Sequence, residues 1–326
     1  MGFTNFPNGI TSFGIPVYGN IPAVRGKVFF VDPKVGLAGN PGTKAKPLAT
    51  LKQAYDKCVT GRGDAIILLS YASGTSADHT SYLSAVLDWS KSGITVVGVA
   101  APTMFGQRAR IANLSTATAL AYLISVSGHG NSFYNISMFN GGSNAAALGC
   151  LKVSGNRNYF YNVHAVGAGH ATPSAAANAV NLEIEGGSEN TFEKCVFGTD
   201  TVNRVGTLDT YDIEFSSGAA RNVFKDCITL SQTTSGQASH LGIKFAGAGD
   251  AITRNQYFMN CHFSNYNEGA ISAQTSLVGG TLPNNGKLVM HGCSSLGYAA
   301  WDSAGAATVF TDQPQSNAAG GIMAGA

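Results

Sequence analysis

An internal repeat of about thirty residues is the feature that most restricts how this chain can fold. Its unit is a small turn, an asparagine, an aromatic residue and a small buried residue. One column of the repeat advances by 27, 32, 32, 34 and 32 residues, through Ile136, Val163, Cys195, Cys227, Cys261 and Cys293. Units of this length that recur at nearly constant spacing indicate a repeat architecture, in which each unit buries its apolar face against its neighbours.

Each unit also contains a short alternating segment ahead of its turn. Apolar residues flank one charged residue in these segments, which predicts strands that turn one face toward a core. The four segments are Leu151-Lys152-Val153, Leu182-Glu183-Ile184, Ile213-Glu214-Phe215 and Ile243-Lys244-Phe245. Two strands per unit and a loop with room for a third predict the coil of a right-handed parallel β-helix, an all-β solenoid.

The composition favours strands and turns over helices. Only 12% of the residues are charged, whereas soluble proteins average about 25%, and glycine occupies 41 of the 326 positions. Hydrophobic residues make up 44% of the chain, which is enough for a buried core. The formal net charge is +2, and without a cluster of Lys and Arg no nucleic-acid partner is expected.

Neither a membrane nor a secretion route is expected from the sequence. No apolar run is long enough to cross a bilayer, and the N-terminus lacks the basic and apolar regions of a secretory signal. Synthesis in a cytoplasm is therefore expected, where cysteines stay reduced.

A short helix is expected near the start of the solenoid. Thr50 can cap its N-terminus, and Leu51, Ala54, Tyr55 and Cys58 would share one apolar face. That helix would close the open end of the stack of coils.

The sequence predicts three regions. They are an N-terminal arm at residues 1–27, a parallel β-helix at residues 28–296 with its N-terminal cap at residues 28–70, and a C-terminal tail at residues 297–326.

The cap region carries a family resemblance. Its residues are Val31-Asp32-Pro33, Gly42-Thr43, Lys46-Pro47-Leu48-Ala49-Thr50-Leu51, Ala54 and Gly63-Asp64-Ala65-Ile66-Ile67-Leu68. This pattern resembles the N-terminal cap of pectin-lyase-like β-helix proteins, which include polysaccharide lyases, hydrolases and bacteriophage tailspikes. Together with the repeats, the resemblance covers residues 28–296 and implies a fold more strongly than a function, because the superfamily contains enzymes and non-enzymes.

The N-terminal arm points to a partner surface. Residues 1–24 contain no charged residue, but they do contain Phe3, Phe6, Phe13 and Tyr18. Such a segment cannot form its own core, so we expect its aromatic side chains to be buried against another surface.

The opening residues 3–14 resemble the start of tailed-bacteriophage virion proteins. The resemblance implies a structural protein located in the virion, either a capsid decoration or cement protein (a knob) or a tail-associated spike. It also implies a homotrimer whose arm binds the major capsid protein or another virion protein.

Glu183 and Glu214 are the alternative catalytic candidates. They occupy the same outward position in adjacent coils, about 4.8 Å apart, which is near the carboxyl spacing of about 5 Å in retaining glycosidases. The full column reads Lys152, Glu183, Glu214, Lys244, and this alternation favours a charge ladder on a sheet face. No residue is therefore favoured as catalytic.

Two other functions stay open on the sequence. One is a tailspike-type polysaccharide depolymerase, either a polysaccharide lyase or a glycoside hydrolase. The other is a non-catalytic protein that binds a host surface glycan. No cofactor is expected in either case.

A column of cysteines is expected to be structural, and all six cysteines of the chain are expected to be free. Parallel strands project equivalent side chains the same way, which keeps neighbouring sulfur atoms too far apart to bond and favours a buried ladder of small apolar thiols. The ladder comprises Cys195, Cys227, Cys261 and Cys293.

A column of asparagines is also expected to be structural. Asparagine tolerates a left-handed backbone, and its amide can stack between coils. The column comprises Asn131, Asn158, Asn190, Asn222 and Asn255. No metal site is expected, because His164 and His262 hold equivalent positions three coils apart.

Overall fold

The computed structural model describes residues 24–71, 74–234, 239–266, 274–302 and 308–312. It also describes the backbone of two short strands, β1 (Thr11–Ser12) and β2 (Ile15–Pro16), which pair in antiparallel fashion. The arm residues Phe3, Phe6, Phe13 and Tyr18 lie outside the described residues, as do residues 313–326.

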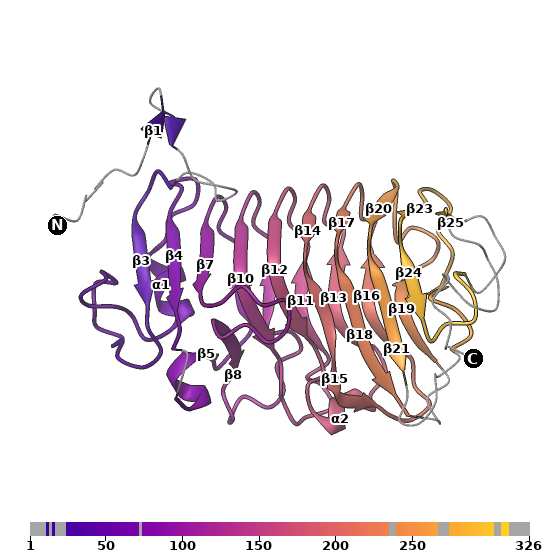
Figure 1. The fold of residues 1–326 in the computed structure, drawn as a ribbon, viewed down its shortest axis with the longest axis horizontal. Coiled ribbons are helices and arrows are strands. Elements are labelled where there is room, and N and C mark those ends of the chain that lie inside the picture. Colours follow the sequence, from indigo (N-terminus) through magenta and orange to yellow (C-terminus); the bar gives the residue numbers. More distant parts are fainter. Residues whose placement is uncertain are drawn as a thin grey trace.

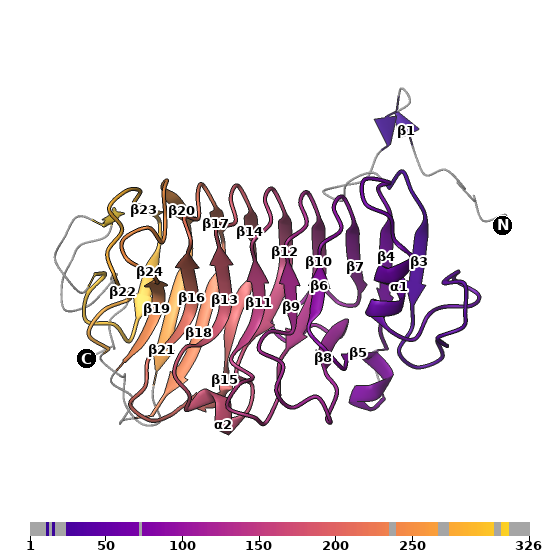
Figure 2. The same ribbon diagram turned by 180° about the vertical axis from the view of Figure 1, so that it is seen from behind.

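The chain folds into a single right-handed parallel β-helix, as predicted (Figures 1 and 2). Apart from β1 and β2, every strand pair in the described part of the chain is parallel. Equivalent strands of successive coils lie side by side, so that the coils stack along the long axis of the molecule (Figure 1). The repeat of about thirty residues is therefore one coil.

Each complete coil contributes strands to three faces. The first face comprises β3 (Val28–Val31), β4 (Ala65–Leu69), β7 (Thr95–Val99), the first part of β10 (Ser132–Phe139) and of β12 (Tyr159–Val166), β14 (Thr191–Glu193), β17 (Val223–Lys225), β20 (Gln256–Met259), β23 (Leu288–His291) and β25 (Val309–Thr311). The second face comprises β5 (Thr80–Leu83), β8 (Arg110–Asn113), the remainder of β10 and β12, β15 (Val196–Arg204), β18 (Ile228–Thr233), β21 (His262–Tyr266) and β24 (Ser294–Leu296). The third face comprises β6 (Leu87–Trp89), β9 (Ile124–Val126), β11 (Gly149–Val153), β13 (Ala179–Glu185), β16 (Thr210–Ser216), β19 (His240–Phe245) and β22 (Val278–Gly280).

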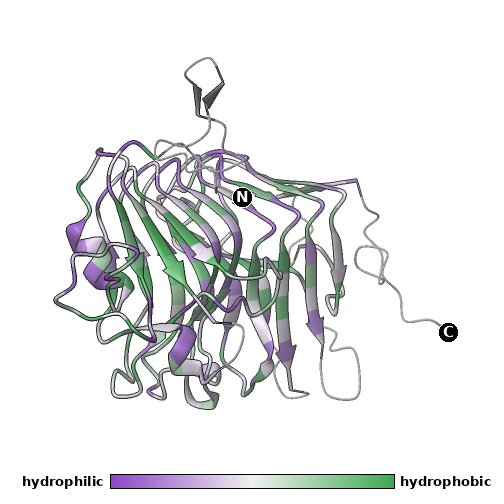
Figure 3. Ribbon diagram, turned by 60° about the vertical axis from the view of Figure 1, so that its left-hand side comes forward, coloured by the Kyte–Doolittle hydropathy of each residue, from purple (hydrophilic) through white to green (hydrophobic). Residues whose placement is uncertain are grey.

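A stack of phenylalanine rings runs through the core behind the first face. Successive ring centroids are 5.0, 4.7, 4.8 and 4.4 Å apart, and each pair is nearly parallel. The rings belong to Phe133, Phe160, Phe192, Phe224 and Phe258. Along the strands, hydrophobic residues alternate with hydrophilic ones (Figure 3), so each coil buries one side of every strand against this core.

Residues with a left-handed backbone conformation form the two tight bends of each coil. The bend between the first and second faces is made by a single residue with φ between 52° and 56°, namely Asn135, Asn162, Lys194, Asp226 or Asn260. The turn from the third to the first face places Arg157, Glu189 or Arg221 in this region, immediately before the predicted asparagine column. The prediction that the column residues themselves adopt the left-handed backbone is therefore wrong, because their neighbours adopt it.

The predicted capping helix is present as α1 (Leu51–Lys57). The Thr50 side chain accepts a hydrogen bond from the Gln53 backbone N–H, and Gln53 bonds back to the Thr50 backbone. Leu51, Ala54 and Tyr55 are buried. Two further helical segments, η1 (Ser76–His79) and α2 (Ala171–Ser174), lie in loops. None of the helices described here is long and apolar enough to cross a membrane.

The solenoid continues beyond the predicted boundary at residue 296. Strand β25 pairs with β23 and extends the first face, while Tyr298 and Trp301 are buried in the core. Asp302 forms a bridge to Val278 of the third face. Residues 298–302 and 308–311 are thus part of the stack of coils and not of a tail.

Candidate functional site

The outer side of the third face brings the predicted pair of carboxylates together. Parallel register pairs Lys152 with Glu183, Glu183 with Glu214, and Glu214 with Lys244. In each strand, the apolar residues before and after the charged residue point into the core. The four charged side chains therefore lie on the outer side of the sheet. Adjacent strands in such a sheet lie about 4.8 Å apart, which is the separation expected for this pair.

Glu183 is buried, which corrects the expectation of an exposed charge column. Only 8% of the residue is exposed. Its carboxylate accepts hydrogen bonds from the hydroxyl of Tyr122 and from Ser216 Oγ at 3.3 Å, and lies 3.7 Å from Lys152 Nζ. Burial and the charge of Glu183 raise the pKa of the Tyr122 hydroxyl. The Glu183 carboxylate is thus surrounded by donors from three neighbouring strands or loops.

Tyr122, which lies in the loop that leads into β9, was not predicted from the sequence. Its ring crosses the start of β11 at Gly149, where an added Cβ would come within 2.2 Å of Tyr122 Cε1. The following coils carry Val180, Tyr211 and Leu241 at this position, so a glycine there was the available signal that another group crosses the strand.

Glu214 lies in a different environment from Glu183. Burial raises the pKa of Glu214, Lys244 opposes this effect, and the charge of Glu183 adds to it. Lys244 Nζ donates to the hydroxyl of Tyr211 at 2.6 Å and lies 4.0 Å from the centre of that ring. Two adjacent carboxyl groups in unlike environments are the arrangement that separates an acid from a base or nucleophile in glycosidases.

The predicted cysteine column is buried and lies next to the phenylalanine stack. Each thiol lies within hydrogen-bonding distance of a phenylalanine carbonyl oxygen in the preceding coil, at 3.4, 3.3, 3.5 and 3.5 Å. The four residues are Cys195, Cys227, Cys261 and Cys293. All six cysteines are unpaired and buried, and burial raises the pKa of Cys58 and of Cys150 to about 12.

The asparagine column forms a continuous amide ladder. From Asn158 onward, each side-chain oxygen accepts from the backbone N–H and from the side-chain amide of the member one coil earlier, at 2.9 to 3.2 Å. The members are Asn131, Asn158, Asn190, Asn222 and Gln256. The last member is Gln256 and not the predicted Asn255. Gln256 lies two residues before its stacked phenylalanine, as Asn222 does, and it accepts from the Asn222 side chain.

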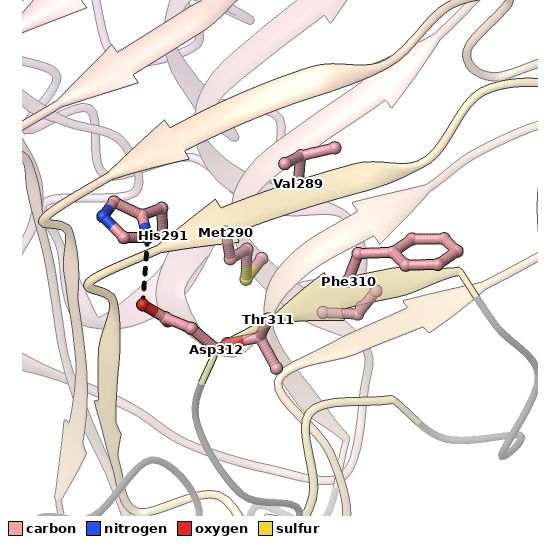
Figure 4. Close-up of a pocket in the computed structure, with 7 residues that line it drawn as sticks. Val289, Met290, His291, Phe310, Thr311 and Asp312 are labelled. Atoms are coloured by element: carbon pink, nitrogen blue, oxygen red, sulfur yellow. Dashed lines mark ion pairs between the residues drawn. The ribbon is translucent and has the colours of Figure 1, made fainter.

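A shallow pocket lies at the C-terminal end of the first face, between β23 and β25 (Figure 4). His291 Nδ1 lies 3.0 Å from Asp312 Oδ2 at its rim, and Phe310 lines it with half of its surface exposed. Among the residues that the structure describes, no three His, Cys, Asp or Glu side chains are grouped to share a metal ion.

The strand register and the side-chain ladders define a right-handed parallel β-helix. Two structures of a pectin methylesterase from Aspergillus niger align over 90% of this chain and 84% of their own, with identities of 15% and 14% and TM-scores of 0.53 and 0.52. A Geobacillus virus E2 protein, ORF18, aligns over 86% of this chain and 60% of its own, at 14% identity, and its TM-score of 0.31 is too low to carry an argument. No protein-family model and no curated protein sequence matches the chain. At these identities the similarity shows the fold alone, which this chain shares with polysaccharide-acting enzymes.

Proposed function

We propose that this chain is a structural component of a tailed-bacteriophage particle, either a capsid decoration protein or a tail-associated spike. In this proposal the N-terminal arm attaches a rigid solenoid to the particle, and three copies associate. The resemblance of residues 3–14 to virion proteins supports it, as does the uncharged aromatic arm ahead of a solenoid with its own core and cap.

The observation that most favours a structural role over a catalytic one is the state of Glu183. Its carboxylate is 8% exposed and engaged by Tyr122, Ser216 and Lys152. A nucleophile or base must reach a substrate atom directly or through one water, and this carboxylate is instead used to join neighbouring coils.

Adding the protein back to particles tests the proposal. Particles assembled without the protein are mixed with the full chain or with a variant in which Phe3, Phe6, Phe13 and Tyr18 are all replaced by serine. We expect the wild-type chain to sediment with the particles and the arm variant to stay in the supernatant, because the arm loses its apolar contact area.

A matched control replaces four exposed apolar residues of the solenoid by serine. These are Val35, Leu37, Met259 and Phe310. The control should bind particles like the wild type. If the arm variant binds fully, or if the wild-type chain does not bind at all, the proposed attachment is wrong.

A polysaccharide-cleaving enzyme is the second candidate function. The raised pKa of Glu214 and its place beside Glu183 favour it, because glycoside cleavage uses two neighbouring carboxyl groups held in unlike environments. Incubation with bacterial surface polysaccharides would detect new chain ends. Cleavage by the wild type that Glu214→Gln abolishes would establish this function, whereas binding without cleavage would identify a glycan receptor.

A further inference from the structure

Among the described residues, no carboxylate pairs with two arginines near the N-terminal end of the second face. Arg110 begins β8, and Arg108 lies two residues earlier on the loop that leads into it. Within the part of the chain that the structure describes, neither guanidinium forms an ion pair. By contrast, Arg62 Nε lies 2.6 Å from Asp64 Oδ1.

Arg110 has a hydrogen-bond donor that is buried without an acceptor. Parallel register places Arg110 between Thr80 of β5 and Ser137 of β10 on the outer side of the second face. The Nε–H of Arg110 is buried and unpaired, and so is the hydroxyl of Thr80 on the neighbouring strand. The two unpaired donors therefore belong to directly paired residues on neighbouring strands, which lie about 4.8 Å apart.

His79 supplies a second unpaired N–H at the same place. It precedes Thr80 in the chain and is only 1% exposed. Arg108 Nη1 lies 3.4 Å from His79 Nε2. Because a guanidinium can only donate, Nε2 must accept, and the ring proton must then sit on Nδ1. His79 Nδ1 is buried and has no partner.

The positive charges at this place act on one another. Burial and the charge of Arg108 lower the pKa of Arg110, and burial with both guanidinium groups lowers the pKa of His79. The adjacent Asp78 is engaged elsewhere, since its carboxylate accepts the Thr75 backbone N–H and lies 3.7 Å from Lys34 Nζ.

We propose that Arg108, Arg110, His79 and Thr80 form a binding site for an oxyanion: a carboxylate, a sulfate or a phosphate. An oxyanion supplies several acceptor atoms and negative charge together, which is what two unpaired N–H groups, a free hydroxyl and two guanidinium groups require. The natural ligand would present such a group to the second face. The proposal goes beyond a virion role and does not depend on it.

Locating the anion directly tests the geometry. Crystals of the full chain are soaked in selenate, a sulfate analogue whose selenium gives an anomalous signal. We expect an anomalous peak within hydrogen-bonding reach of Arg110 Nε and His79 Nδ1. Peaks only at other places, or none at saturating selenate, would overturn the assignment.

Solution binding tests the chemistry and the class of anion. Unfolding midpoints of the full chain are measured against rising sulfate, phosphate or acetate, with chloride used to hold ionic strength constant. A ligand that binds only the folded state raises the midpoint in a saturable way. The ranking of the three anions distinguishes a tetrahedral oxyanion from a carboxylate, and no stabilisation beyond that of chloride by any of them contradicts the proposal.

Variants assign this binding to the site. Arg110→Gln should weaken anion binding about tenfold or more, as expected for lost hydrogen bonds to a charged group. The exposed Arg108→Gln should also weaken it and provides a second variant if the first folds poorly. Arg254→Gln removes an exposed arginine whose guanidinium donates to the Thr253 carbonyl, and this variant should bind like the wild type. Equal binding by all three variants would refute the site.

Discussion

At the scale of single residues, the Glu183 carboxylate links side chains of neighbouring coils, because it accepts from Tyr122 and Ser216 and faces Lys152. The repeat places Glu183 and Glu214 in one column, and the register confirms that they are neighbours. The burial of Glu183 depends on Tyr122, which belongs to a loop outside the repeat unit. Strand alternation distinguishes the inner from the outer side of a sheet, but it does not predict which loops cover the outer side.

Glu183→Gln is expected to lower the free energy of unfolding by about 1–3 kcal/mol, because it replaces a buried acceptor for two hydroxyl donors and removes a charge facing Lys152. Denaturant titration measures this change. The control is Asp56→Asn, which breaks an exposed i, i+4 pair with Lys52 and should cost about 0.5 kcal/mol or less. Equal small losses in both variants would show that Glu183 behaves as an ordinary surface charge.

Glu214→Gln is expected to remove a loss of stability that ionisation of Glu214 causes as the pH rises. The raised pKa of Glu214 means that the folded state binds this proton more tightly than the unfolded state. Its contribution is therefore fully present below the ordinary pKa of about 4.3 and is lost as pH rises through the raised value. Relative to the wild type, the variant should gain stability between pH 4 and pH 7 in urea titrations. A difference that stays constant across this range would contradict the raised pKa.

At the scale of elements, the N-terminal cap is fastened by one buried carboxylate. Asp64 Oδ1 accepts from the Lys27 backbone N–H at 2.7 Å, and Oδ2 accepts from the Val59 N–H at 2.8 Å. Both oxygens also bond Arg62. Burial would raise the pKa of Asp64, but these hydrogen bonds outweigh it and hold the pKa below its usual value. Asp64, which directly precedes β4, thus links this strand to the start of β3 and to the loop that follows α1.

Asp64→Asn is expected to destabilise the fold by about 1–3 kcal/mol at neutral pH, because one of the two buried oxygens that accept the Lys27 and Val59 backbone N–H groups becomes an amide nitrogen that cannot accept. Because the pKa of Asp64 is lower in the folded state than in the unfolded state, its carboxylate stabilises the fold at pH values above the ordinary pKa. This stabilisation is lost as the pH falls through the pKa of the folded state. The difference between wild type and variant in thermal or urea unfolding should therefore shrink below about pH 4. A difference that grows on acidification would have the wrong sign for this account.

The repeat also explains which elements the sequence could locate. Strands of the coils that carry the asparagine and phenylalanine columns were predicted from spacing alone, and α1 from the cap at Thr50. The last coil was missed because the phenylalanine column ends at Phe258, and β23 and β25 carry Met290 and Thr311 at its position. His79 and Arg108 were missed for the same reason, since their coils lack the motif and no column brings these residues together.

At the scale of the whole molecule, one continuous core runs through the solenoid and contains every cysteine. The folded chain should therefore resist thiol alkylation until it unfolds, because its thiols are buried and ionise only at high pH where burial raises their pKa. Denaturation without reductant should then allow six labels by mass spectrometry, one for each free cysteine. Four labels would mean a disulfide and a different register of the coils.

The most direct test of the proposed role is cryo-electron microscopy of particles from a host that produces this chain, compared with particles made without it. The account predicts rod-shaped density that fits the parallel β-helix, grouped in threes, with the first 24 residues running from its N-terminal end onto the particle surface. Particles that lack this density, while the purified chain cleaves a bacterial polysaccharide through Glu214, would contradict a structural role.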